Sequence, residues 1–85
     1  MTVEKTYYPQ GYPVVNNEVT DAALAYVKPL MVARSGVEHS LTDIDALLLS
    51  GQPFYQYIPG SGTLVFNPFN PFQQDESINI IYAIP

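Results

Sequence analysis

The chain of 85 residues contains no cysteine, one histidine and only three basic residues, Lys5, Lys28 and Arg34. The absence of cysteine excludes disulfide scaffolds and cysteine-based zinc sites. Three scattered cations form no basic stripe that could neutralise phosphates, so we expect no nucleic-acid partner. The net charge of −5 agrees with that expectation.

The sequence also lacks a signal-peptide core and a long hydrophobic run. Its first residues, MTVEKTYYPQ, contain no apolar segment of the kind that a leader needs. The longest apolar clusters, residues 29–33 and 46–49, fall far short of the roughly 20 residues that cross a bilayer. We therefore expect no membrane partner, and the missing cysteine suits assembly in a reducing cytoplasm.

Apolar residues are abundant, whereas charged ones are few. Hydrophobic residues make up 47% of the chain, which argues against disorder throughout, and charged residues make up 13%. A small soluble domain usually carries about 25–35% charged residues on its surface. A single domain of this size also has a thin core. We therefore expect a partner to cover part of the apolar surface.

Residues 1–19 are predicted to form an extended N-terminal arm. Pro9 and Pro13 fix φ, remove backbone donors and push the preceding residues toward extended conformations. The tyrosines of this arm are Tyr7, Tyr8 and Tyr12. A frayed terminus is one interpretation. We favour docking on a neighbouring subunit, because tyrosine suits contacts that are apolar on one side and wet on the other.

Residues 20–85 are predicted to form a mainly β domain, a small antiparallel β-sandwich of the immunoglobulin-like or jelly-roll-like kind. Short strand-like runs separated by turn residues favour this architecture. The expected strands are residues 30–34 with a return to 42 after a turn at Ser35 and Gly36, 46–50, 54–58 paired with 63–67, and 78–84. Residues 20–27 suit either one short helix, capped by Thr20 or Asp21, or a further strand.

The repeated NPFNPF of residues 67–72 cannot continue a central strand, because proline lacks the donor that a ladder needs. Two interpretations remain open. The repeat could form turns that bury both phenylalanines, or a ridge that inserts Phe69 and Phe72 into a partner's pocket. Together with the three tyrosines, these two phenylalanines are the predicted protein-contact residues.

Catalytic and metal-binding constellations are not expected. His39 has neither a second histidine nor a cysteine to share a metal, and an exposed loop position is its default. Asp43 and Asp45 lack the remaining ligands of a calcium loop, so a turn or helix cap is the favoured role. Ser35 and Ser50 precede glycines but do not lie in a G-x-S-x-G elbow. We predict a non-enzymatic protein with no catalytic residue, no metal and no cofactor.

Residues 47–84 resemble a small β-domain of bacteriophage structural proteins, which occurs in tail fibres, head fibres and adaptors. Ser50-Gly51 stands where that family has Asn-Gly, Tyr57 falls at its aromatic position, GTLVF of residues 62–66 matches its second strand, and DESINIIY of residues 75–82 matches its last. The resemblance implies a virion building block that is repeated in a symmetric assembly.

The expected function is that of a virion structural protein, assembled in the host cytoplasm, which decorates a capsid or attaches a fibre or tail. The expected partners are other virion proteins: a major capsid, portal, tail or fibre protein. A homo-oligomer is also expected, with a trimer among its candidate states. Repeated weak contacts would supply avidity. The alternative is a receptor- or carbohydrate-binding module of a phage fibre.

Overall fold

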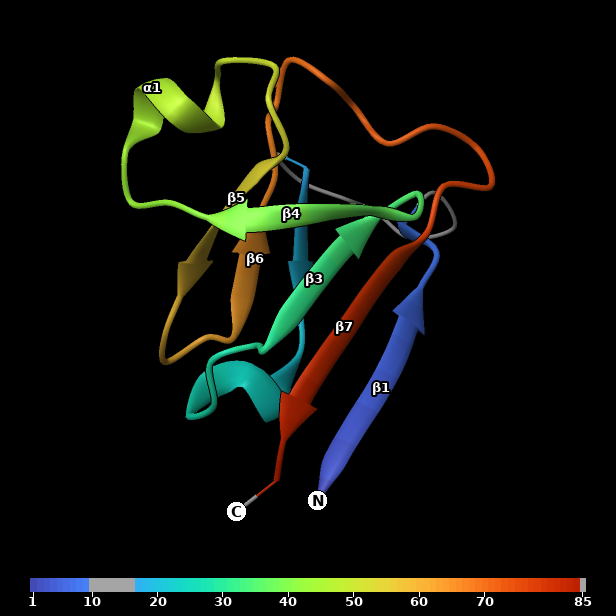
Figure 1. Cartoon of the computed structure of the whole chain (residues 1–85), viewed down its shortest axis with the longest axis vertical. Coiled ribbons are helices and arrows are strands. Elements are labelled where there is room, and N and C mark those ends of the chain that lie inside the picture. The colour runs from blue at the N-terminus through green and yellow to red at the C-terminus, as the bar shows by residue number, and fades with distance from the viewer. Residues whose placement is uncertain (10–16, 85) are drawn as a thin grey trace.

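The computed structural model describes residues 1–9 and 17–84, and the prediction of a mainly β fold is confirmed (Figure 1). No helix in this described part is long and apolar enough to span a bilayer. The elements in chain order are β1 (Thr2–Tyr7), β2 (Glu18–Thr20), the 3-10 helix η2 (Ala22–Ala25), β3 (Met31–Arg34), β4 (Val37–Leu41), α1 (Asp45–Leu48), β5 (Phe54–Ile58), β6 (Thr63–Val65) and β7 (Ile78–Ala83).

The seven strands form one sheet in the order β1-β7-β3-β4-β5-β6-β2. All neighbours are antiparallel except β4 and β5, which run parallel. Strand β4 pairs with β3 through its first residues and with β5 through Ser40 and Leu41. The sheet therefore curls into a half-barrel, with β1, β7 and β3 in front of β5, β6 and β2 in Figure 1. One curled sheet encloses the core, in place of the two separate sheets of a sandwich.

The two predicted hairpins are confirmed. Strands β3 and β4 are joined by Ser35 and Gly36, whose φ values of 50° and 79° are both positive. Such a two-residue turn matches the twist of the flanking strands. Strands β5 and β6 pair from Gln56 opposite Val65 to Ile58 opposite Thr63. Local turn chemistry was sufficient to predict both pairings.

The core lies inside the curl of the sheet. Strand β7 shows the predicted alternation, because Ile78, Ile80 and Tyr82 are buried while the residues between them are half-buried. The remaining core residues come from the other strands, η2 and the loop after β6: Val19, Leu24, Val32, Tyr55, Leu64, Phe66 and Phe72.

The prediction of a buried strand at residues 46–50 is wrong. This segment holds the helical turn α1, in which only Leu48 is buried. Parallel neighbours cannot be joined by a tight hairpin, so the chain needs a longer connection between β4 and β5. A short apolar run alone does not distinguish a strand from a helical segment.

The predicted arm also differs from the structure where its residues are described. Residues Thr2–Tyr7 are extended, but they pair with β7 along their whole length. Residues Glu18–Thr20 pair with β6. These two strands are the edges of the sheet and not parts of a detached arm. The helix alternative holds for residues 20–27, since Asp21 caps η2 by accepting a hydrogen bond from the Ala23 N–H.

Candidate functional site

The predicted contact residues occupy different environments. Phe69 and Tyr8 are 78% and 59% exposed, so both can meet a partner. Tyr7 is half-buried and packs against the core, and Phe72 is buried. Tyr12 lies outside the described residues.

Tyr7 connects the two edges of the sheet. Its hydroxyl donates a hydrogen bond to the Asp21 carboxylate, which directly follows β2. The ammonium group of Lys5 lies 3.2 Å from the same carboxylate oxygen. Strands β1 and β2 are thus linked by side chains where no ladder joins them, and this contact gives Tyr7 a structural role.

The contact of Tyr7 with Asp21 changes the acidity of both groups. Burial, followed by the bond to Asp21, raises the pKa of Tyr7 to about 12. Burial by itself would raise the pKa of Asp21, but hydrogen bonds from Tyr7, the Ala23 N–H and Lys5 together lower that pKa below its usual value. Stability should therefore depend on pH at both ends of the scale.

The two phenylalanines of NPFNPF differ in burial. The Phe72 ring packs at a centroid distance of 5.6 Å from Phe66 and 4.5 Å from the guanidinium carbon of Arg34. The Asn67 side chain accepts a hydrogen bond of 2.9 Å from the Phe69 N–H, which forms a local turn and leaves the Phe69 ring in solvent. The interpretation of a buried turn therefore holds for Phe72, whereas Phe69 is exposed and its contact with a partner stays a prediction.

Asn17, which the sequence analysis missed, holds this loop in place. Its side-chain amide donates to the carbonyl oxygens of Asn67 and Asn70, both at 2.9 Å, and accepts from the Phe72 N–H at 3.0 Å. Its φ of 61° is left-handed, a conformation that asparagine tolerates better than most residues. In the sequence, the Asn-Asn pair before β2 was the only signal of a special role for Asn17. It did not show that Asn17 binds the NPFNPF loop.

Arg34 also holds this loop in place and was likewise missed. Its guanidinium forms two hydrogen bonds with Glu76 and one of 2.7 Å with the Asn70 carbonyl. The bond from Arg34 is the main reason why the pKa of Glu76 is lowered. A lone arginine within the apolar pattern MVAR was a signal for a buried ion pair, because arginine is rarely buried unless paired.

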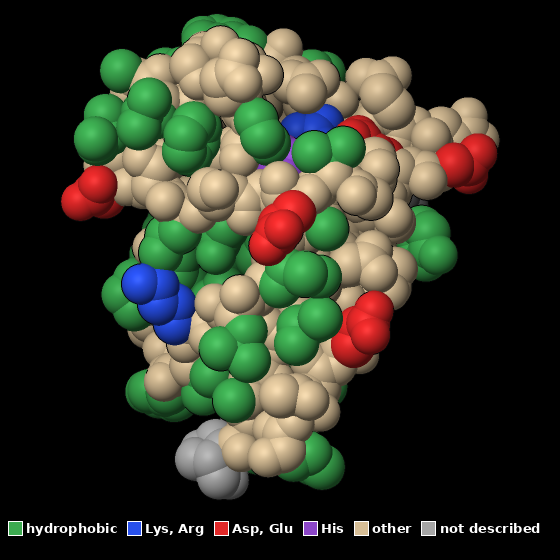
Figure 2. All heavy atoms as spheres, in the orientation of Figure 1, with side chains coloured by type: hydrophobic (Ala, Val, Ile, Leu, Met, Phe, Trp, Pro, Cys, Tyr) green, Lys and Arg blue, Asp and Glu red, His purple; other side chains and the backbone are tan. Residues whose placement is uncertain are grey.

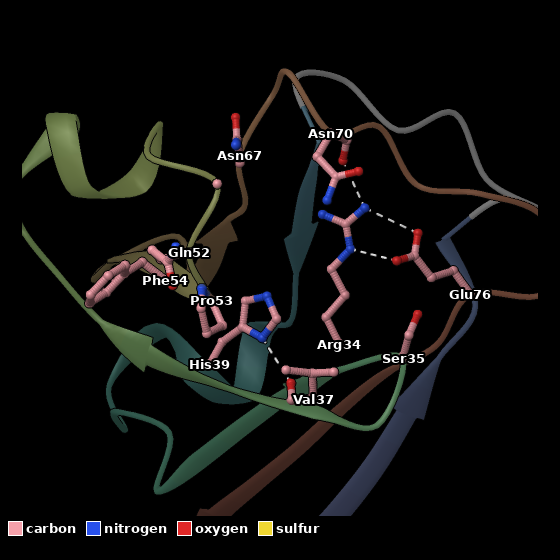
Figure 3. A pocket seen from close by; sticks show the side chains of 11 residues that line it. Arg34, Ser35, Val37, His39, Gln52, Pro53, Phe54, Asn67, Asn70 and Glu76 are labelled. Atoms are coloured by element: carbon pink, nitrogen blue, oxygen red, sulfur yellow. Dashed lines mark hydrogen bonds and ion pairs between the residues drawn. The ribbon is translucent and has the colours of Figure 1, made fainter.

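A cavity of about 300 Å³ lies beside Arg34, between the β3–β4 turn, the segment before β5 and the NPFNPF loop (Figure 3). His39 stands at its centre on β4, half-buried, and not in the exposed loop that was expected. The imidazole packs edge-on against Phe66 at 5.8 Å. The lining residues are Arg34, Ser35, Val37, His39, Gly51, Gln52, Pro53, Phe54, Asn67, Asn70 and Glu76.

Apolar side chains gather over α1, as Figure 2 shows at upper left. We define the α1 apolar surface as the exposed side chains of Leu41, Ile44, Leu47 and Leu49. It borders a groove of about 740 Å³ whose lining also includes Ile58, Tyr57, Lys28, Asp43 and Asp45. Grouped exposed apolar residues are typical of interaction sites.

The polar residues considered for chemistry are dispersed. Asp45 begins α1 and accepts a hydrogen bond from Gln56, while the Ser50 hydroxyl donates to the Leu47 carbonyl at the end of that turn. Ser35 lies in the β3–β4 turn. Within residues 1–9 and 17–84, no three histidine, aspartate or glutamate side chains are grouped as a metal site requires.

Comparisons of the chain with known proteins found no match. No family model matches the chain, and neither a curated protein nor a solved structure is significantly similar to it.

Proposed function

We propose that the chain is a non-enzymatic structural protein of a virion, which decorates a capsid or attaches a fibre or tail through repeated protein–protein contacts. The virion setting is supported by the sequence resemblance of residues 47–84. The contact role is supported by the α1 apolar surface, where Ile44 is 53% exposed and none of the four side chains belongs to the core.

The proposed contact combines this surface with the exposed ring of Phe69. Leucine, isoleucine and phenylalanine side chains lose contact with water when a partner covers them, which contributes about 25 cal/mol per Å² of apolar area. The Phe69 ring projects from a loop that Asn17 and Arg34 hold in one conformation. A preformed loop loses little conformational entropy on binding, so its contacts yield more net affinity.

The experiment measures oligomeric state by size-exclusion chromatography with light scattering. We expect the purified chain to form a homo-oligomer, because in that sample only another copy of the chain can cover the α1 apolar surface. The substitutions Ile44→Asn and Leu47→Asn remove apolar area without touching the core, so the double variant should elute as a folded monomer. Retained far-ultraviolet circular dichroism would show that the fold is intact.

Leu30→Asn is the matched control, because Leu30 is also exposed but precedes β3, outside the α1 apolar surface. Its assembly should equal that of the unchanged chain. A monomer at every concentration, or a double variant that assembles normally, would contradict the proposed contact surface. Binding of the monomer to a glycan array would favour the receptor-binding alternative.

A further inference from the structure

We propose that the cavity beside Arg34 binds a small carboxylate carried on a compact apolar body. This inference is independent of the proposed function. It is drawn from the donors that line the cavity, the apolar walls around them and the space between them.

Arg34 supplies the first donor. Its Nε bonds to Glu76, and its Nη2 bonds to Glu76 and to the Asn70 carbonyl. Among the described residues none accepts a hydrogen bond from Nη1, and Figure 3 shows one terminal guanidinium nitrogen pointing into the cavity without a partner. Because the side chain is only 5% exposed and held at three points, this donor is fixed before a ligand arrives.

His39 and Asn67 supply the next polar groups. The Nδ1 atom of His39 lies 2.8 Å from the Val37 carbonyl oxygen, which can only accept, so Nδ1 carries the proton and Nε2 faces the cavity. The Asn67 oxygen is occupied by the Phe69 N–H, and its amide nitrogen points toward the cavity. The donors of Arg34 and Asn67 thus come from two segments and face one space, which the His39 ring also lines.

The remaining walls suit an apolar body. Pro53 and Phe54 line the side of the cavity away from Arg34, and Val37, which pairs with Arg34 between β3 and β4, adds a further apolar group. A volume of about 300 Å³ is at the small end of ligand pockets and accepts a single ring with a carboxylate. Donors on one wall and apolar groups on the other favour a ligand of that mixed character.

Two charged side chains of opposite sign face His39. Arg34 faces it from β3 and Glu76 from the loop before β7, so these two charges offset each other. Glu38 is exposed on the same strand but projects to the opposite face. A carboxylate in the cavity therefore meets no net negative charge from this lining, and the Nη1 atom of Arg34 can donate to it.

The test is a titration of the full chain with phenylacetate, followed by the nuclear magnetic resonance signals of the Arg34 side chain and the His39 ring. We expect saturation with a Kd on the order of 5 mM at pH 6. Phenylacetamide, which has the same shape without the charge, should bind at least about fivefold more weakly. Equal binding of acid and amide, or no shift at either residue up to about 50 mM, would overturn the proposal.

Two variants locate the effect. Asn67→Asp keeps the oxygen that accepts from the Phe69 N–H but places a negative charge where the amide nitrogen faces the cavity, so it should weaken phenylacetate binding at least about fivefold. Glu38→Gln removes one negative charge outside the cavity and should bind phenylacetate as the unchanged chain does. Unchanged binding by Asn67→Asp would overturn the assignment to this cavity.

Two peptides test whether the carboxylate belongs to a chain terminus or to a free acid. Gly-Gly-Phe with a free C-terminus and the same peptide with a C-terminal amide are compared with phenylacetate. Tighter binding of the free peptide than of phenylacetate would support a chain terminus as the ligand. Binding of phenylacetate alone would support a free acid, and failure of both acids would overturn the site.

Discussion

Arg34 on β3 and Glu76 in the loop before β7 form a two-point ion pair, although 42 residues separate them in sequence. The Nε–Oε2 distance is 2.7 Å and the Nη2–Oε1 distance is 3.1 Å. The two side chains are only 5% and 13% exposed. Removing one member of such a pair leaves an uncompensated charge that is largely shielded from solvent, which costs far more than losing a surface pair.

The substitution Glu76→Gln should therefore lower the free energy of unfolding by roughly 2–4 kcal/mol. Urea denaturation followed by tyrosine fluorescence measures the change. Glu38→Gln makes the same chemical change at an exposed position, where an effect within about 0.5 kcal/mol is expected. Equal stability of the two variants would show that the ion pair does not hold the loop.

The NPFNPF repeat provides a second matched pair. Phe72→Ala removes a buried ring that packs against Phe66 and Arg34, so it should cost roughly 3–5 kcal/mol of stability. Phe69→Ala removes a ring in solvent and should change stability by less than about 0.5 kcal/mol. Thermal unfolding of both variants tests this difference, and similar melting temperatures would contradict the burial of Phe72.

Alanine substitutions at Gly62 and Gly60 distinguish the cost of a steric conflict from the cost of backbone strain. Both have positive φ, 70° and 88°, so alanine at either position should cost about 1–2 kcal/mol for that conformation. A Cβ at Gly62 would also lie 2.1 Å from the Asp21 carbonyl oxygen, whereas at Gly60 it meets nothing within 4 Å. Gly62→Ala should thus be much less stable than Gly60→Ala in urea denaturation. A Gly62→Ala variant as stable as Gly60→Ala would exclude the close approach of Gly62 to η2.

Stability should fall in acid because the pKa values of Asp21 and Glu76 are lowered in the folded chain. As the pH falls, these carboxyl groups take up protons in the unfolded chain before they do so in the folded chain. The stabilisation is therefore complete above their ordinary pKa values near 4, and it is lost as the pH falls through the lower pKa values of the folded chain. Asp21→Asn combined with Glu76→Gln should flatten the profile of unfolding free energy between pH 5 and pH 2. Asp43→Asn, at an exposed site, is the control and should leave the slope unchanged.

Stability should also fall in alkali because the pKa of Tyr7 is raised to about 12. Between pH 10 and 12 the folded chain keeps the phenol proton that the unfolded chain has released, so unfolding becomes easier as the pH rises. Tyr7→Phe should reduce this dependence, whereas Tyr26→Phe, at a fully accessible ring, should not. Ultraviolet absorbance at the phenolate band during alkaline titration provides the measurement. Ionisation of Tyr7 together with the exposed tyrosines would refute the prediction.

The local sequence was sufficient to predict the mainly β class, both hairpins and the buried face of β7. Ser35 and Gly36 accept the positive φ of a tight turn, and the alternation of residues 78–83 separates an inner from an outer face. These features depend on backbone sterics and on side-chain period. Both act between residues that are close in the chain, so a sequence pattern reports them.

The tertiary structure alone decided which segments meet. The parallel pairing of β4 with β5 turned residues 46–50 into a helical connection, and pairing with β7 made residues 2–7 an edge strand. The fold also brought Asn17 and Arg34 together around Phe72, while Phe69, in an identical tripeptide, stayed in solvent. Burial and ion pairing depend on distances across the fold, and identical local sequences carry no record of those distances.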